Sequence, residues 1–155
     1  MEEVPITPKV VVSLVEKNGS FVLIQRQITL QGKSNGNQWR LEWVFPGGLL
    51  KPDETDKQAV VRETLEEVGL NVEVIKLLHE RKHPQTYVPI AYFACRLMDE
   101  SQEPTIGEPR EIKKVEWVMA HEVIARFESF GLDVDPVAKE YVLGFVTETG
   151  KELKS

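Results

Sequence analysis

The sequence contains one cysteine among its 155 residues, and it has no long apolar run. A single thiol excludes a disulfide within the chain, and Cys95 lies in an apolar stretch where a buried structural thiol is expected. The longest apolar run, residues 10–15, is broken by Ser13 and falls far short of the roughly 20 residues that cross a bilayer. The N-terminus also lacks the basic start and apolar stretch of a secretion signal. We therefore expect a cytosolic location.

Positive charge is in short supply as well. Lysine and arginine number 19 against 25 aspartates and glutamates, which gives a net charge of −6. Proteins that bind the nucleic-acid backbone neutralise phosphates with clustered basic residues, so we expect no nucleic-acid duplex and no membrane as a partner. A small phosphate-bearing substrate remains compatible with this charge, because divalent cations can lie between an acidic pocket and a polyphosphate.

The length and composition fit one ordinary globular domain, residues 1–155. Hydrophobic residues make up 41% of the chain and charged residues 28%, and neither a repeat nor a linker interrupts it. A monomer and a homodimer are both compatible with these features.

Residue patterns predict strands and helices in a mixed order. Two β-branched runs, residues 9–15 and 20–25, flank residues 16–19 and predict a hairpin with an Asn18-Gly19 turn. The remaining expected elements are a loop at 28–38, strands at 39–45, 72–78, 86–97 and 115–119, a polar bridge at 79–85, a loop at 101–110, and helices at 55–68, 121–130 and 136–145. This order predicts an α+β fold with helices covering a mixed sheet.

The clearest helix is residues 55–68. Thr55 and Gln58 form a capping box, and Gly69 is a natural stop. At about 100° per residue, one narrow sector gathers three glutamates, Glu63, Glu66 and Glu67. We expect the opposite side to pack against the core through Val61, Leu65 and Val68.

Three neighbouring carboxylates repel one another, and the only basic residue in the adjacent turns is Arg62. Divalent cations would relieve this repulsion, and carboxylate oxygens suit Mg²⁺ or Mn²⁺ rather than zinc. A solvated acidic surface is the alternative interpretation of the same residues. The pair Gly47-Gly48 before the helix favours a site, since glycine lets the backbone approach a ligand, although it also suits a simple turn.

These residues carry a resemblance to a known family. Gly48, Glu54 and the run Arg62-Glu63-Thr64-Leu65-Glu66-Glu67-Val68-Gly69-Leu70 have the spacing of the signature of the Nudix hydrolases, the family of the MutT-type nucleotide pyrophosphohydrolases. Thr64 stands where an aliphatic residue is usual. Seven fixed polar or glycine positions make this pattern far more specific than a lone glycine motif.

The resemblance implies an α/β/α sandwich and a Mg²⁺-dependent hydrolysis of a nucleoside diphosphate linked to another moiety. Metals lower the pKa of bound water and neutralise charge on phosphate oxygens. By the same resemblance, the metal ligands are Glu63, Glu66, Glu67 and the Gly47 carbonyl. Arg62 would orient the glutamates and Glu54 would support them through Arg62.

A further catalytic acid is expected from a distant loop. Glu111, six residues before Trp117, has a position similar to that acid in MutT-type members, and Glu108 is the competing candidate. A solvated loop is the alternative for both. Arg26, at the end of an expected strand, is a candidate phosphate ligand, or a solvated strand end.

Substrate choice is expected to depend on residues outside the signature. Phe127, Phe130 and Asp133 precede the last helix, where MutT-like proteins place groups that read the base. Asp135 lies there too, but directly before Pro136 it is better interpreted as a helix cap. His83 is a weaker candidate, in a segment that Pro84 makes a turn.

Three functions therefore stay open. A hydrolase of nucleoside triphosphates, including oxidised ones, is favoured. A hydrolase of ADP-ribose, another nucleotide sugar or a dinucleoside polyphosphate shares the metal chemistry. A non-catalytic binding module of the same fold is the third, and the intact acidic set argues against it.

Overall fold

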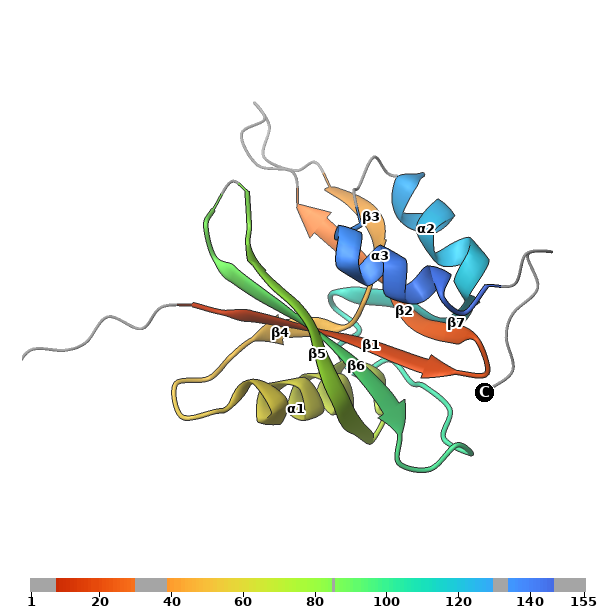
Figure 1. Ribbon diagram of the computed structural model, residues 1–155, viewed down its shortest axis with the longest axis horizontal. Helices are drawn as coiled ribbons and strands as arrows, with labels where there is room; N and C mark the ends of the chain where they lie inside the picture. Colours follow the sequence, from red (N-terminus) through yellow and green to blue (C-terminus); the bar gives the residue numbers. More distant parts are fainter. Residues whose placement is uncertain (1–7, 30–38, 85, 130–133, 147–155) are drawn as a thin grey trace, which may run out of the picture.

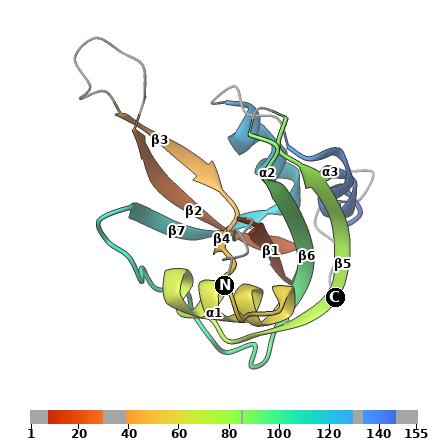
Figure 2. The ribbon, with the colours of Figure 1, turned by 90° about the vertical axis from the view of Figure 1, so that its left-hand side faces the viewer.

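The computed structural model describes residues 8–29, 39–84, 86–129 and 134–146. Along the chain the elements are β1 (Val10–Lys17), β2 (Ser20–Thr29), β3 (Trp39–Val44), β4 (Gly47–Leu49), α1 (Asp56–Val68), β5 (Val72–Lys82), β6 (Pro89–Leu97), β7 (Ile112–Met119), α2 (Ala120–Glu128) and α3 (Pro136–Leu143). Helix α1 covers one face of the sheet, and α2 and α3 cover the other (Figures 1 and 2). The predicted α+β sandwich is confirmed. No helix in the described ranges is long and apolar enough to cross a membrane.

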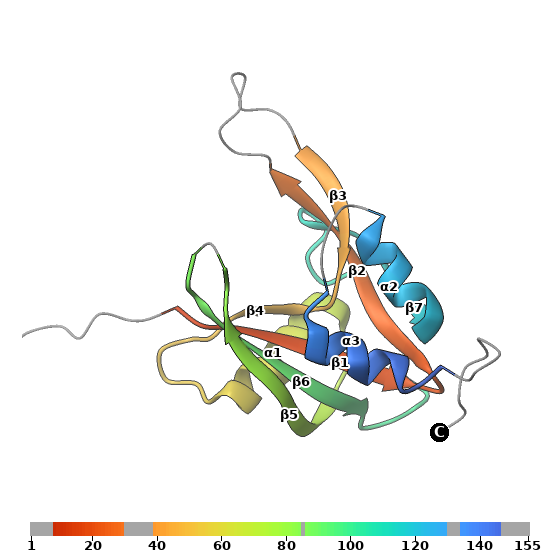
Figure 3. The ribbon, with the colours of Figure 1, turned by 45° about the horizontal axis from the view of Figure 1, so that its top comes forward.

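The seven strands form one mixed sheet. Its main path is β3-β2-β1-β6-β5, while β4 pairs with β1 and β7 pairs with β2. Strands β1 and β6 are parallel and the other pairs are antiparallel. The β1–β2 register is confined to the turn, at Glu16↔Phe21 and Lys17↔Ser20. Beyond it β2 and β3 diverge from β1, β5 and β6, as Figure 3 shows. Strand β4 pairs with Val10–Val12, a part of β1 that does not pair with β2.

The hairpin turn between β1 and β2 is the one that the sequence predicts. Asn18 and Gly19 have positive φ angles of 51° and 82°. Two consecutive positive φ angles match the twist of a two-residue hairpin, and Asn-Gly adopts them readily.

Period-two alternation in the central strands builds a core on each face. Odd positions of β1 such as Val11 and Val15 pack under α1, whereas Leu14 packs under α2 and α3. In β2 it is the even positions, such as Val22 and Ile24, that pack under α1. Because side chains of a strand alternate between faces, these apolar strands supply both layers of the sandwich.

The alternative interpretation of Gly47-Gly48 as a simple turn does not hold. Gly47–Leu49 is strand β4, and it pairs with Val10–Val12 of β1. A Cβ added to Gly47 would lie 2.4 Å from the carbonyl oxygen of Val11. Gly47 therefore allows β4 to lie close to β1 and does not reverse the direction of the chain.

Other strand ends also differ from the prediction. Strand β5 continues to Lys82 through most of the predicted polar bridge, and β6 begins at Pro89 rather than at residue 86. The bridge prediction failed because the β5–β6 ladder extends past the apolar part of either strand.

Helix α1 has the predicted ends but not the predicted packing face. Both capping-box hydrogen bonds at Thr55 are present, and Gly69 closes the helix in the left-handed conformation with φ of 69°. Val68 is buried as expected, but Val61 and Leu65 are 37% and 46% exposed. The buried set is Ala59, Val60, Thr64, Glu67 and Val68. A carboxylate thus occupies a position where hydrophobic periodicity places an apolar side chain.

The loop after β6 closes the C-terminal end of α1. The Thr105 N–H donates to the Val68 carbonyl at 2.8 Å, and the Gly107 N–H donates to the Glu67 carbonyl at 2.9 Å. Carbonyls at a helix C-terminus have no partner within the helix, so these bonds supply one. The loop is thereby fixed against the helix that carries the glutamates.

Gly107→Ala tests this contact. An added Cβ would lie 1.7 Å from the Glu66 carbonyl oxygen, so the loop has to move away, and we expect a loss of about 1–3 kcal/mol in the free energy of unfolding. Urea unfolding measures it. The control is Gly144→Ala, where φ is −63° and the nearest atom is 3.3 Å away, with an expected change under about 1 kcal/mol. Equal effects of the two substitutions would contradict the proposed contact.

Candidate functional site

The centre of the candidate site is the buried carboxylate of Glu67, whose residue is 1% exposed. Its Oε1 accepts a 2.7 Å hydrogen bond from the Gly47 N–H of β4. Its Oε2 forms an ion pair with the Arg26 guanidinium from β2. Burial raises the Glu67 pKa to about 7, against the opposing effects of the Arg26 charge and the Gly47 N–H. Three separate elements therefore meet at one carboxyl group.

Glu63 reaches the same glycine strand from one turn earlier in α1. A Cβ added to Gly48 would lie 2.4 Å from Glu63 Cδ and 2.6 Å from both of its carboxylate oxygens. Only a residue without a side chain allows this approach. The charge of Glu63 also raises the Glu67 pKa, which places the two acids within electrostatic reach.

Arg62 holds the acids on the outer side of the helix. Its Nε and Nη2 donate to Glu54 at 2.5 and 2.8 Å, and its Nη1 donates to Glu63 at 2.9 Å and to Glu66 at 3.2 Å. The Leu49 carbonyl accepts a fifth bond from Nη2 at 3.1 Å. Arg62 lowers the pKa of Glu54 to about 2. These contacts are those that an orienting role for Arg62 and a supporting role for Glu54 require.

The donor chemistry of the three glutamates fits a hard divalent cation, because every candidate ligand is an oxygen. Their arrangement is not a ready-made metal cage. The Glu66 side chain is half exposed and turned to Arg62, and the described residues contain no cluster of three or more His, Cys, Asp or Glu side chains placed to hold a metal. Arg26 pairs with Glu67, and Arg62 pairs with Glu66.

The two loop acids lie differently relative to Glu67. Both are exposed, but the charge of Glu108 raises the Glu67 pKa, and its neighbour Gly107 is bonded to the helix. Glu111 instead uses its carbonyl to accept the Gln27 N–H at 2.9 Å, beside Arg26. Glu108 therefore lies within electrostatic reach of Glu67, and both loop acids stay candidates.

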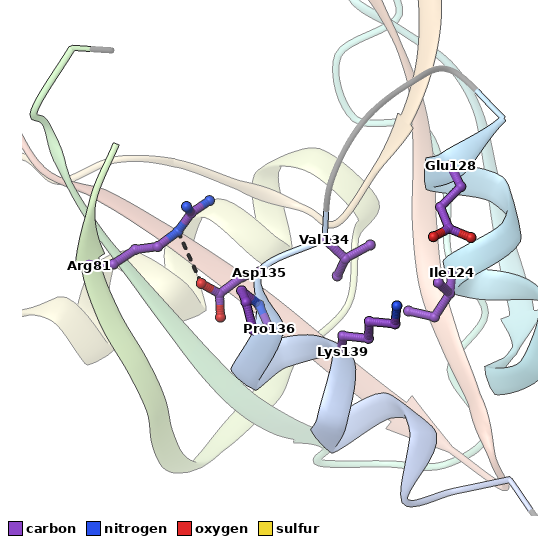
Figure 4. Close-up of a pocket in the computed structure, with 7 residues that line it drawn as sticks. All are labelled: Arg81, Ile124, Glu128, Val134, Asp135, Pro136 and Lys139. Carbon is purple, nitrogen blue, oxygen red and sulfur yellow. Dashed lines mark ion pairs between the residues drawn. The ribbon is translucent and has the colours of Figure 1, made fainter. Parts of the chain in front are cut away.

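Two adjoining pockets open on the opposite face of the sheet, beside α2 and α3. The larger, about 470 Å³, is lined by Arg81, Ile124, Glu128, Val134, Asp135, Pro136 and Lys139 (Figure 4). The smaller, about 190 Å³, shares Val134 and Asp135 and adds Val12, Val44, Phe45, Tyr92 and Phe127. Val12 is the register partner of Gly47. The smaller pocket and the glutamates of α1 thus lie on opposite faces of the sheet at the Val12–Gly47 pair.

The residues expected to choose the substrate divide into three groups. Phe127 lines the smaller pocket and packs edge-to-face on Phe45 with centroids 5.0 Å apart. Phe130 and Asp133 lie outside the described residues. His83 lies in the β5–β6 turn, where its Nδ1 accepts from the Thr86 N–H at 3.3 Å, and it lines neither pocket.

Asp135 is the N-cap of α3, as the sequence predicts. Its Oδ2 accepts from the N–H groups of Val137 and Ala138, both at 3.1 Å. Its Oδ1 lies 3.0 Å from Nε of Arg81, whose Nη2 donates to the Tyr92 hydroxyl at 3.2 Å. The sequence interpretation missed Arg81 because it lay in the segment predicted as a bridge. Its position on the extended β5 brings it to the pocket.

Known proteins support the family assignment. A family model for the NUDIX domain matches residues 5–139. Human diphosphoinositol polyphosphate phosphohydrolase 2 is 38% identical over 80 residues, covering 48% of this chain and 44% of the relative. The CTP pyrophosphohydrolase of Escherichia coli K12 is 38% identical over 66 residues, covering 43% of this chain and 44% of the relative. The chain thus spans less than half the length of these curated relatives.

Solved structures agree with the fold. A NUDIX hydrolase from Nitrosomonas europaea matches 99% of this chain and 78% of its own, with a TM-score of 0.68 and 19% identity. The E. coli ORF135 protein matches 89% of this chain and 87% of its own, with a TM-score of 0.57 and 23% identity. With the signature glutamates gathered on α1 above Gly47-Gly48 and a family model spanning most of the sequence, the chain belongs to the Nudix family.

Proposed function

We propose that the protein is a Mg²⁺-dependent pyrophosphohydrolase that cleaves a nucleoside diphosphate linked to another moiety, with a nucleoside triphosphate as the favoured substrate. The observation that carries this proposal is the convergence of Glu63 and Glu67 on Gly47-Gly48, on the same part of the sheet as a pocket. The carboxylate oxygens of these glutamates are hard ligands of the kind that Mg²⁺ bound to a polyphosphate prefers.

Each residue of the site has a role in this scheme. Glu63, Glu66, Glu67 and the Gly47 carbonyl would hold Mg²⁺ or Mn²⁺, which supplies an activated water and neutralises phosphate charge. Arg62 orients the glutamates, with Glu54 holding Arg62 in turn. Arg26, which pairs with Glu67, would contact the phosphates.

The pocket supports a nucleotide substrate. Phe45 and Phe127 line the smaller pocket with aromatic rings, and Arg81 lines the adjoining larger pocket with hydrogen-bond donors. The E. coli relative is named for CTP, whereas the human relative is named for diphosphoinositol polyphosphates. ADP-ribose, other nucleotide sugars and dinucleoside polyphosphates are the second candidate class, and a binding module without turnover is the third.

A substrate panel tests the function. It contains nucleoside and oxidised nucleoside triphosphates, ADP-ribose, dinucleoside polyphosphates and a diphosphoinositol polyphosphate, each with and without Mg²⁺. We expect the nucleoside triphosphates, with CTP among them, to give the highest kcat/KM and to release pyrophosphate. Glu67→Gln should lower kcat by at least about 10²-fold, because a bound metal supplies several kcal/mol of charge stabilisation. Inertness toward the whole panel would favour the binding module.

Glu66→Ala is the second arm of that experiment. Because Glu66 is a proposed metal ligand, its removal should abolish Mg²⁺-dependent turnover. Its side chain is half exposed and one repulsion between carboxylates disappears, so the free energy of unfolding in EDTA should stay unchanged or rise slightly. Glu73→Ala, an exposed acid on β5, is the matched control with normal turnover. Loss of folding in Glu66→Ala would show a structural role for this face.

The loop acid can be identified by two isosteric substitutions. We expect Glu108→Gln to lower kcat by about 10²-fold or more, the usual contribution of a general base, because Glu108 is coupled to Glu67. Glu111→Gln should change kcat by less than about threefold. Single-turnover rates under saturating Mg²⁺ measure both. The opposite ranking would assign the role to Glu111.

A further inference from the structure

Both oxygens of the buried Glu67 carboxylate are already engaged. Oε1 accepts from the Gly47 N–H at 2.7 Å, and Oε2 contacts Nη2 of Arg26. The Glu67 side chain is 2% exposed, whereas that of Arg26 is 28% exposed. A divalent cation that takes Glu67 as a ligand must therefore share or replace the arginine at Oε2.

Arg26 is the cation on which Glu67 depends in this arrangement. Arg62 is committed to Glu54, Glu63 and Glu66, so among the described residues Arg26 is the basic side chain in direct contact with Glu67. A buried carboxylate without a counter-ion is strongly unfavourable, and Arg26 provides that counter-ion.

The position of Arg26 against Glu67 leaves part of the guanidinium unsatisfied. Its Nε is buried and has no hydrogen-bond partner among the described residues. Its register partner across β2 and β3 is Glu42, which is 6% exposed. Directly opposite residues of an antiparallel pair point to the same face with Cβ atoms about 5 Å apart. Glu42 thus places a second acid on the face of the sheet that Arg26 occupies.

We propose that Arg26 is an exchangeable counter-ion. It neutralises Glu67 while no divalent cation is bound, and it leaves Glu67 when the metal arrives, so that the guanidinium is free to meet incoming phosphates. This inference rests on the proposed function, because it takes Glu67 to be a metal ligand. It adds that Arg26 has one position before a divalent cation binds and another position afterwards.

Two consequences follow for binding. Metal uptake by the free protein has to break the Arg26–Glu67 pair, so the pair weakens metal affinity. The guanidinium becomes free for a polyphosphate only after that exchange, so metal and substrate should each strengthen binding of the other. Arg26 would then be a positioning residue that couples metal binding to polyphosphate binding.

Side-chain NMR of ¹⁵N-arginine-labelled full-length protein tests the exchange without turnover. The Arg26 signals are assigned by their loss in Arg26→Lys, and Mg²⁺ is titrated in the absence of nucleotide. We expect restricted guanidinium rotation for Arg26 in EDTA and a shift to free rotation with Mg²⁺, at the same midpoint as the Gly47 and Glu67 backbone signals. In Glu67→Gln the freely rotating form should already be present in EDTA.

Arg96 is the internal control, because its pair with Glu73 is exposed and lies on β5 and β6. Its signals should not change. If backbone signals of the glycine strand respond to Mg²⁺ while Arg26 stays restricted, the exchange is wrong and the proposed metal site stands. If no signal responds to Mg²⁺, both the exchange and the metal-dependent function are wrong.

Discussion

The arrangement of this protein depends on one buried carboxylate, that of Glu67. Helix α1 presses the face that carries Glu67 against the sheet, and this is tolerated because the Gly47 N–H and the Arg26 guanidinium lie at its two oxygens. A buried charge without such partners would neutralise or destabilise the fold. Strand β4, the part of β2 around Arg26 and helix α1 are therefore fixed relative to one another by the group that we propose binds metal.

The divergence of the sheet turns this packing into a site. Because β2 leaves β1 soon after the hairpin, β4 can pair with Val10–Val12 and bring its glycines beneath α1. The same opening exposes the other side of β1, where Val12 and Phe45 line the smaller pocket. The glutamates and the smaller pocket therefore lie on opposite faces of the sheet at the Val12–Gly47 pair. The fold and the proposed chemistry share the same few residues.

Local signals in the sequence predicted local structure well. The Asn18-Gly19 turn, the cap at Thr55, the stop at Gly69 and the cap at Asp135 were all confirmed, since each depends on residues within one turn of the chain. Hydrophobic periodicity misjudged α1 at Val61 and Leu65, because the helix buries the polar residues Thr64 and Glu67 instead. Strand β4 and the Arg26–Glu67 pair, which joins residues 41 apart in sequence, have no local signature. The roles of the glutamates came from the family resemblance and stay proposals.

Glu67 links these points, and its role as a metal ligand is the claim that most needs a direct measurement. Crystals grown with Mn²⁺ and measured for anomalous scattering would locate any bound ion without reference to substrate. The account predicts a peak beside Gly47-Gly48 within about 2.0–2.4 Å of carboxylate oxygens of Glu67 and its neighbours on α1. A peak elsewhere, or saturating Mn²⁺ with none at this position, would contradict it.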